Sequence, residues 1–256
     1  MEHFYTPKKF ITKNSLLIEG DEANHLKKVL RKNSGDIIRV TDGENSLYEC
    51  SIENISGEKI ECKIISRIEE TFEPKIKIHL FPALLKSTER FGFMIEKSVE
   101  LGVHEIHPVI SEHVEVKSAD KTKRWNTISL SAMKQSQRCY LPKVNPPVDF
   151  ETAIKNCGTE LKLIAHEKTF TFSSPLIFGK SMFQPAGKLE MVSIAVFIGP
   201  EGGFSEKEIA LAESYGAKII SLGKRKLRSE TASIIISGFL LSSVNSPLSY
   251  QERGRG

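Results

Sequence analysis

Hydrophobic and polar positions follow two different patterns along the chain, one before and one after about residue 73. In the first part, short segments alternate between apolar and polar residues, and glycine-containing turns separate them. The alternating segments are Ser15–Ile18, Asp36–Val40, Ser46–Ile52 and Lys59–Ile65, and the turns are Ser34-Gly35, Asp42-Gly43 and Ser56-Gly57. Alternation with a period of two is typical of half-buried strands, so this part predicts a small β-barrel or sandwich.

One helix interrupts the alternating segments. From Asp21, which can cap a helix, apolar residues recur at the spacing expected of one buried helix face. The apolar residues are Ala23, Leu26, Val29 and Leu30, and the other side carries His25, Lys27, Lys28, Arg31 and Lys32. Such a basic run is either a solvated face or a surface for RNA phosphates, and the charge pattern leaves both readings open.

After the Glu69–Pro74 segment, strand-like apolar runs alternate with stretches of helical period. The strand-like runs are Ile76–Phe81, Glu105–Ile110, Leu161–Ala165, Val192–Ile198 and Ala217–Leu222, and the helical stretches are Arg90–Leu101, Lys123–Gln137 and two that begin at Glu206 and near Ser229. This alternation predicts a mostly parallel sheet. We therefore expect an α/β protein with a β domain at residues 1–72, an α/β domain at 73–250 and a frayed tail at 251–256.

The last two strand–loop–helix units carry the strongest candidate for a binding site. The first strand ends at the Gly199–Gly203 loop, after which Ser205 and Glu208 form a capping-box pattern that begins a helix. The second strand ends at Gly223, which opens the basic loop Lys224–Arg228. Loops at the carboxyl ends of parallel strands are where open α/β sheets bind ligands. The two loops are thus either a cofactor site or ordinary turns between strand and helix.

The composition is that of a globular protein with a mild positive charge. The 256 residues are 39% hydrophobic and 27% charged, with a formal net charge of +4, which permits a nucleic-acid partner without requiring one. The four cysteines lack the spacing of metal ligands, so we expect reduced thiols in a cytoplasmic protein. We expect neither a signal peptide nor a membrane span, since no apolar run has the required length.

Several classes of site are excluded by missing motifs. The chain has no G-x-G-x-x-G after a strand, no H-E-x-x-H and no G-x-S-x-G, which argues against a Rossmann dinucleotide site, a zincin and an α/β-hydrolase. His104 and His107 lie near a strand with Glu105 between them. A strand would direct the two histidines to opposite faces, so we expect no metal site.

Five segments of the chain have a distinctive sequence. The two loops read IGPEGGFS at Ile198–Ser205 and LGKRKLRSETA at Leu222–Ala232, and the three earlier segments are Glu96–Val103, Gln135–Pro142 and, in the first domain, His25–Asp36. Together they resemble the RsmE family, the ribosomal RNA small-subunit methyltransferases of the SPOUT superfamily. The resemblance covers nearly the whole chain. It implies a PUA-like barrel followed by a SPOUT domain whose parallel sheet contains a deep trefoil knot.

The resemblance also implies an activity. The cofactor would be S-adenosylmethionine, the protein would be a homodimer, and the substrate would be N3 of one uridine in the 16S rRNA of the 30S subunit. The positions that would bind the cofactor are Ile198, Gly199, Glu201, Gly202, Gly203, Leu222, Gly223, Leu227, Thr231 and Ala232. The alternatives are a ribose 2′-O-methyltransferase of the same superfamily and a non-catalytic RNA-binding factor in ribosome assembly.

Three residues are candidates for the chemistry. Arg228 would stabilise the oxyanion that develops on the uracil ring, or it would grip a phosphate. Glu230 or Glu201 would accept the N3 proton. Alternatively, Glu230 complements the N-terminus of the following helix, and Glu201 fixes the glycine loop.

Basic residues outside this trio would hold the RNA. The expected RNA-binding residues are Lys27, Lys28, Arg31, Lys32, Lys86, Arg138, Lys224 and Arg225. The chain departs from the family pattern at two positions. His113 lies where the family often has arginine, which weakens the inference of an RNA contact there, and Ser229 replaces a common threonine but keeps its hydroxyl.

Overall fold

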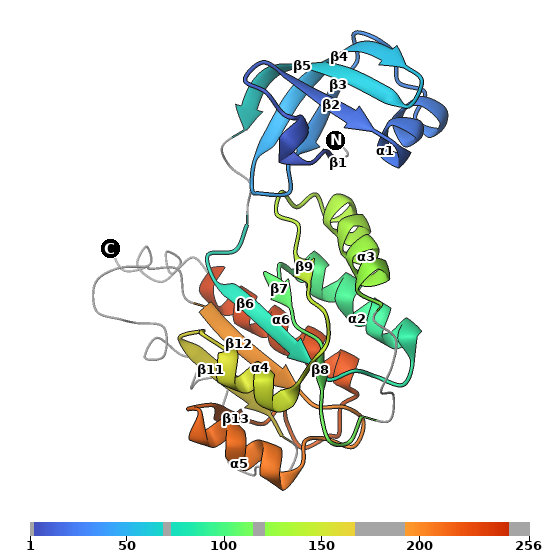
Figure 1. Ribbon diagram of the computed structural model, residues 1–256. Helices are drawn as coiled ribbons and strands as arrows, with labels where there is room; N and C mark the ends of the chain where they lie inside the picture. The colour runs from blue at the N-terminus through green and yellow to red at the C-terminus, as the bar shows by residue number, and fades with distance from the viewer. Residues whose placement is uncertain (1–2, 69–72, 115–120, 167–192, 246–256) are drawn as a thin grey trace, which may run out of the picture. The chain divides into compact units, whose positions relative to one another are not determined.

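The computed structural model describes residues 3–68, 73–114, 121–166 and 193–245 (Figure 1). The chain forms two compact units: Met1–Glu73 with Ser129–Pro142, and Pro74–Ile128 with Lys143–Gly256. The first break after Glu73 lies next to the boundary expected at residue 72. The expected tail at 251–256 lies outside the described residues.

The second piece of the first unit was not expected from the sequence. Glu73 is one of the residues that bind Ser129–Pro142 to this unit: its carboxylate accepts hydrogen bonds from the Arg138 guanidinium at 2.7 Å and from the backbone N–H of Cys139 at 3.1 Å. Thr41 donates its hydroxyl to the carbonyl of Cys139 at 3.0 Å. These hydrogen bonds join residues that are 65 or more positions apart in the chain. No local pattern of apolar and polar residues can predict such contacts.

The β part of the first unit is a five-stranded sheet. Its strands are β1 (His3–Tyr5), β2 (Ser15–Glu19), β3 (Ile37–Thr41), β4 (Leu47–Ser56) and β5 (Lys59–Ile68), paired in the order β1-β3-β4-β5-β2. Alternate residues face a core that includes Ile18, Ile38 and Ile60, each no more than 1% exposed. The prediction of half-buried alternating strands is confirmed.

The helix at residues 21–32 differs from its prediction. It consists of one α-turn, α1 (Asp21–Asn24), followed by a π-helix, η2 (His25–Val29), and its N-cap is Gly20 rather than Asp21. The wider π-turn, in which Leu30 N–H donates to the carbonyl of His25 at 3.1 Å, rotates the later residues out of α-helical register. Ala23 and Leu26 are therefore buried as expected, whereas Val29 is 68% exposed.

The second unit is built on a six-stranded parallel sheet, in the order β13-β11-β12-β6-β7-β9. Its strands are β6 (Lys77–Pro82), β7 (Glu105–Ile106), β9 (Lys143–Val144), β11 (Leu161–Ala165), β12 (Ser193–Ile198) and β13 (Lys218–Ile220). A small parallel pair, β8 (Val109–Ile110) and β10 (Val148–Asp149), stands apart from it. The predicted parallel sheet is confirmed, although the expected strand Glu105–Ile110 is broken into β7 and β8.

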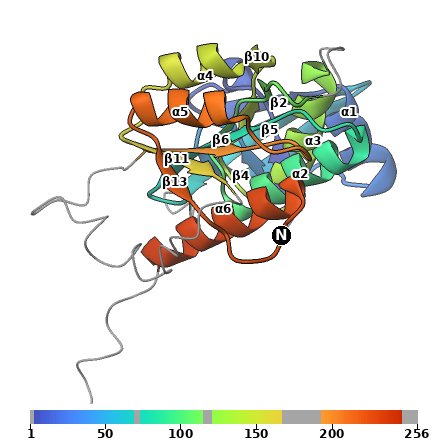
Figure 2. The same ribbon diagram turned by 90° about the horizontal axis from the view of Figure 1, so that it is seen from below.

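Helices cover both faces of this sheet (Figure 2). One face carries α4 (Phe150–Asn156) and α5 (Glu206–Ser214), and the other carries α2 (Thr88–Leu101) and α6 (Ser229–Asn245). A further helix, α3 (Thr122–Gln135), follows β8 in the chain. On the α4–α5 side the core is aromatic: Phe197 of β12 is fully buried and stacks on Phe81 of β6 with ring centroids 4.4 Å apart. Among the described residues, no helix has both the length and the apolar character needed to cross a membrane.

Candidate active site

The first loop leaves β12 as a tight turn. Gly203 N–H donates to the carbonyl of Pro200 at 2.9 Å, and Gly203 has a φ of +74°, a conformation that favours glycine. Ser205 then begins α5 with the predicted capping box: its hydroxyl accepts from Glu208 N–H, and the Glu208 carboxylate accepts from Ser205 N–H at 2.9 Å. Because the helix start is fixed, the Gly199–Gly203 loop is anchored at both ends.

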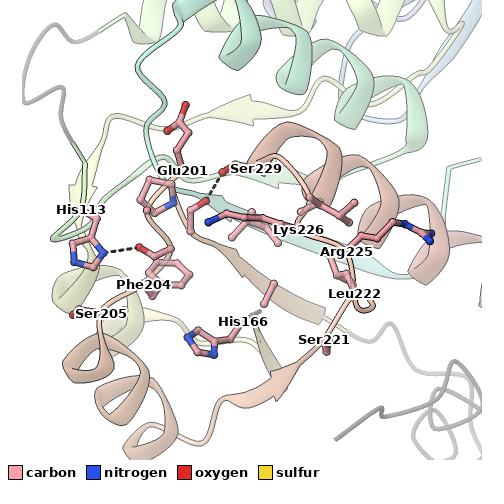
Figure 3. A pocket seen from close by; sticks show the side chains of 18 of the residues that line it. His113, His166, Glu201, Phe204, Ser205, Ser221, Leu222, Arg225, Lys226 and Ser229 are labelled. Atoms are coloured by element: carbon pink, nitrogen blue, oxygen red, sulfur yellow. Dashed lines mark hydrogen bonds between the residues drawn. The ribbon is translucent and has the colours of Figure 1, made fainter. Parts of the chain in front are cut away.

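The second loop leaves β13 and ends at the start of α6. Gly223 has a φ of +116°, and its N–H donates to the Ser221 hydroxyl at 3.3 Å. The Ser229 hydroxyl donates to the carbonyl of Gly199 at 2.6 Å, which joins the second loop to the first (Figure 3). The hydroxyl that serine keeps from the family's usual threonine therefore makes a specific contact.

The two loops enclose a cavity of about 380 Å³. Ala165 and His166, at the end of β11, complete its wall, because β11 lies between β12 and β13 in the sheet. Nine of the ten expected cofactor residues line this cavity: Ile198, Gly199, Glu201, Gly202, Gly203, Leu222, Gly223, Leu227 and Ala232. Thr231, in the first turn of α6, does not line it. The structure thus brings together two loops that are separated in the sequence by one helix and one strand, α5 and β13.

Two histidines at the cavity were not predicted as site residues. His113 lies beside the glycine loop, where its Nδ1 is 3.1 Å from the carbonyl oxygen of Gly203 (Figure 3). His166 follows the last residue of β11 and lines the cavity. The departure at His113 was visible in the sequence, but its contact with the glycine loop depends on folding across 90 residues.

Glu230 is held in an ion pair that the sequence did not reveal. Arg90, on α2, donates through Nε to Glu230 Oε1 at 2.8 Å and through Nη2 to Oε2 at 2.7 Å. The same guanidinium donates through Nη1 to Glu201 at 3.1 Å. Burial by itself raises the pKa of Glu230, but the hydrogen bonds and charge of Arg90 outweigh it and leave the pKa below its ordinary value. A carboxylate in this state is a weak base, and Glu230 does not line the cavity.

The expected RNA-binding residues divide into two groups. Most have exposed or half-buried side chains: Lys27, Lys28, Arg31 and Lys32 in the first unit, and Lys86, Lys224 and Arg225 in the second. Arg225 also lines the cavity, and Arg228 is exposed next to the cavity residue Leu227. Arg138 is different, because its side chain is only 9% exposed and is paired with Glu73. The expectation of RNA binding is therefore corrected for Arg138, which holds the first unit together.

Comparison with known proteins agrees with these features. The protein-family model described as an RNA methyltransferase domain matches residues 72–241 of this chain. A second family model, described as an RNA methyltransferase PUA domain, matches residues 18–65. Ribosomal RNA small subunit methyltransferase E from Mesomycoplasma hyopneumoniae is 35% identical over 92% of this chain and 97% of its own length. The protein of the same name from Bacillus subtilis is 29% identical over 84% of this chain and 85% of its own length.

Solved structures of two similar proteins also cover nearly the whole of this chain. The crystal structure of ribosomal RNA small subunit methyltransferase E from Neisseria gonorrhoeae, bound to S-adenosyl methionine, superposes with a TM-score of 0.81 at 30% identity, covering 94% of this chain and 97% of that one. A Legionella pneumophila structure in complex with the same cofactor has a TM-score of 0.78 at 32% identity, covering 94% and 97%. The resemblance inferred from the two loops is confirmed: this chain belongs to the ribosomal RNA small subunit methyltransferase E family, with a PUA domain followed by an RNA methyltransferase domain.

Proposed function

We propose that this protein transfers a methyl group from S-adenosylmethionine to N3 of one uridine in 16S rRNA. The observation that carries the proposal is the cavity of about 380 Å³ at the carboxyl ends of β11, β12 and β13, framed by the two signature loops. Its size lies within the range of about 300–1,000 Å³ that is usual for cofactor sites. Relatives of the same family hold S-adenosylmethionine in their crystal structures.

The residues of the cavity suit this cofactor. Ile198, Leu222 and Leu227 supply apolar walls, and the backbone of the Gly199–Gly203 loop supplies hydrogen-bonding groups. When bound, S-adenosylmethionine supplies an electrophilic methyl group on a sulfonium, so the protein has chiefly to hold donor and acceptor in line. The fixed turn at Gly203 and the bond between Ser229 and Gly199 hold the loops in place for that alignment.

Replacing Gly199 with alanine tests the cavity. A Cβ at this position would lie 3.1 Å from the backbone C of Gly203 and from Phe204 N, so the loop has to shift. We expect the affinity for S-adenosylmethionine to fall at least about tenfold, since small displacements of positioning groups have large effects. Isothermal titration calorimetry measures this. Gly158→Ala is the matched control, because a Cβ there meets nothing within 4 Å, and equal affinity of the two variants would contradict the assignment.

Arg228 is the residue that we propose acts on the uracil. Its exposed side chain follows Leu227, which lines the cavity, so it is available to a base presented from outside. A guanidinium there stabilises the negative charge that develops on the ring oxygens when N3 loses its proton. Because N3 lies on the Watson–Crick edge, the uridine has to be unpaired or flipped out of its helix. Of the two candidate bases, Glu201 lines the cavity, and Glu230 is a positioning residue.

The RNA would be gripped through its phosphates. Exposed Lys27, Lys28 and Arg31 on the first unit, and Lys224 and Arg225 beside the cavity, supply positive charge on both units. Such contacts fix the position of the RNA without reading its sequence. The 30S subunit as the physical substrate, the trefoil knot and a cytoplasmic location are part of this proposal and come from the family resemblance.

The proposed activity is tested with 30S subunits that lack their modification. The purified protein and labelled S-adenosylmethionine should place one methyl group on N3 of a single uridine of 16S rRNA, mapped by mass spectrometry. Label on a ribose 2′-oxygen would replace this proposal with the related ribose methyltransferase activity. Cofactor binding without transfer to 30S subunits, free 16S rRNA or other RNAs would favour a non-catalytic assembly factor.

We also propose a homodimer formed through α2 and α6. These helices pack together, and both expose large apolar side chains: Phe93 (49%) and Leu101 (38%) on α2, and Ile235 (47%) on α6. Phe93, Lys97 and Leu101 follow one another at intervals of four residues, so they form one stripe on α2. Exposed apolar residues gathered on one face are typical of a surface covered by a partner, here a second copy of this chain.

Ile235→Glu should convert the dimer to a monomer, because the carboxylate would be buried without a partner in the interface. Size-exclusion chromatography with light scattering should give about twice the mass of 28.7 kDa for the wild type and that single-chain mass for the variant. Ile37→Glu is the control, since Ile37 is 45% exposed on β3. A wild type that elutes as a single chain, or a variant that remains dimeric, would contradict this interface.

A further inference from the structure

Three side chains outside the cavity bring metal-ligating atoms together. Oε2 of Glu105 lies 3.1 Å from Nε2 of His107 and 3.4 Å from Nδ1 of His79, and the two nitrogens are 3.5 Å apart. The three atoms therefore form a nearly regular triangle. The side chains are 21–27% exposed, so an ion can reach them from solvent. None of the three residues lines the cavity between the glycine loops.

The triangle has the dimensions of one face of a zinc tetrahedron. Nitrogen and oxygen ligands about 2.0–2.1 Å from a tetrahedral zinc ion lie about 3.3–3.4 Å from one another. The observed separations of 3.1, 3.4 and 3.5 Å bracket this value. Two imidazoles and one carboxylate are also a ligand set that suits zinc, in which three protein ligands leave a fourth position for water.

Backbone pairing and ring packing hold the three ligands in place. His79 on β6 and Glu105 on β7 are register partners in the parallel sheet, so their side chains project from the same face. The His107 ring stacks on Phe81 with centroids 4.5 Å apart and an interplanar angle of 11°.

Asn145 lies next to His107 and can orient its ring. The side-chain amide of Asn145 lies 3.2 Å from Nδ1 of His107, the ring nitrogen that faces away from Glu105. Ligating histidines donate this second N–H to an oxygen, which fixes the ring and its tautomer. A half-turn of the Asn145 amide would present its oxygen to that N–H, and it would exchange this bond for the 3.5 Å contact that Nδ2 now makes with the carbonyl of Ile106.

We propose that His79, Glu105 and His107 bind one zinc ion, with water as the fourth ligand. The ion ties β6 to β7 and to the segment that follows. A longer strand would send His104 and His107 to opposite faces, which is why the sequence pattern predicts no metal site. Because β7 ends at Ile106, this alternation does not apply to His107, and the third ligand comes from a strand 26 residues earlier than Glu105.

Zinc binding is tested on the full chain, purified without a histidine tag, stripped with a chelator and titrated with Zn²⁺ against a chromophoric competitor. We expect one equivalent to bind, and X-ray absorption should show nitrogen and oxygen ligands at about 2.0–2.2 Å with no sulfur. The absence of sulfur matters because Cys50, Cys62, Cys139 and Cys157 are free thiols, all of them buried. Sulfur in the coordination shell, or no stoichiometric binding, would overturn the proposal.

Single variants locate the site. His79→Gln and His107→Gln should each weaken zinc binding by more than about 100-fold, beyond the 10–100-fold expected when a supporting residue such as Asn145 is replaced. His104→Gln is the matched control: its ring packs edge-on against His79 with centroids 5.5 Å apart, yet it contributes no atom to the triangle, so it should bind zinc as the wild type does. Circular dichroism verifies that each variant is folded. Undiminished binding by folded His79→Gln and His107→Gln would place the metal elsewhere and refute the assignment.

Discussion

Replacing Arg228 with alanine should slow methyl transfer to 16S rRNA about 10²–10³-fold, the usual effect of removing one donor to a developing oxyanion. The affinity for S-adenosylmethionine should not change, because Arg228 does not line the cavity. The loss should appear in kcat, since the charge on the uracil oxygens develops only as N3 loses its proton. Single-turnover assays with saturating cofactor and 30S subunits measure this rate directly.

Two comparisons separate this role from a simple phosphate contact. Arg228→Lys keeps a positive charge but loses the planar guanidinium, so it should recover binding of RNA without recovering most of the rate. Arg124→Ala removes an exposed arginine from α3 and should leave kcat unchanged. If Arg228→Ala raises only the KM for the 30S subunit, and Arg228→Lys restores full activity, Arg228 grips a phosphate and does not act on the ring.

The sequence predicted the positions of the two glycine loops well because their signals are local. The capping box at Ser205 and Glu208, the glycines at 203 and 223 and the apolar strands before them each follow from a few neighbouring residues. Parallel strands place their carboxyl ends at one edge of the sheet, so two such loops meet without further information. Nine of the ten expected cofactor residues line the cavity for this reason.

The missed features depend on pairs of residues that are far apart in the chain. Arg90 and Glu230 are separated by 140 positions, and Arg138 and Glu73 by 65. A charged residue has the same appearance in a sequence whether it faces RNA or another side chain, so Arg138 was misassigned. Val29 was misassigned for a different reason, because the π-turn at His25–Val29 changes the helical period within one turn.

Replacing Arg90 with methionine should destabilise the second unit by about 2 kcal/mol, because Glu230 would then be buried without its partner. This is below the value of about 3–5 kcal/mol for fully buried pairs, since solvent reaches part of the guanidinium. The Arg90 side chain is 30% exposed and that of Glu230 is 9% exposed. Urea unfolding at pH 7 measures the difference. The double variant Arg90→Met, Glu230→Gln should recover part of the loss, because the unpaired charge is then gone.

The loss of unfolding free energy in Arg90→Met should depend on pH. The pKa of Glu230 is lowered in the folded protein, so its ion pair stabilises the fold above the ordinary glutamate value of 4.5, and this contribution is lost as the pH falls through the folded pKa. The difference in unfolding free energy between wild type and Arg90→Met should therefore be largest near neutral pH and should shrink on acidification below about 4.5. A difference that stays constant from neutral pH to well below pH 4.5 would mean that Arg90 acts through packing.

The same variants decide what Glu230 does in catalysis. As a positioning residue, Glu230 acts through Arg90 on Glu201 and the glycine loop, so Glu230→Gln and Arg90→Met should raise the KM for S-adenosylmethionine by similar factors. The double variant should then be little worse than either single one, since both changes break one network. If Glu230 were the base, Glu230→Gln alone would reduce kcat by about 10²-fold or more and would flatten the pH–rate profile, whereas Arg90→Met would raise the apparent pKa of that profile.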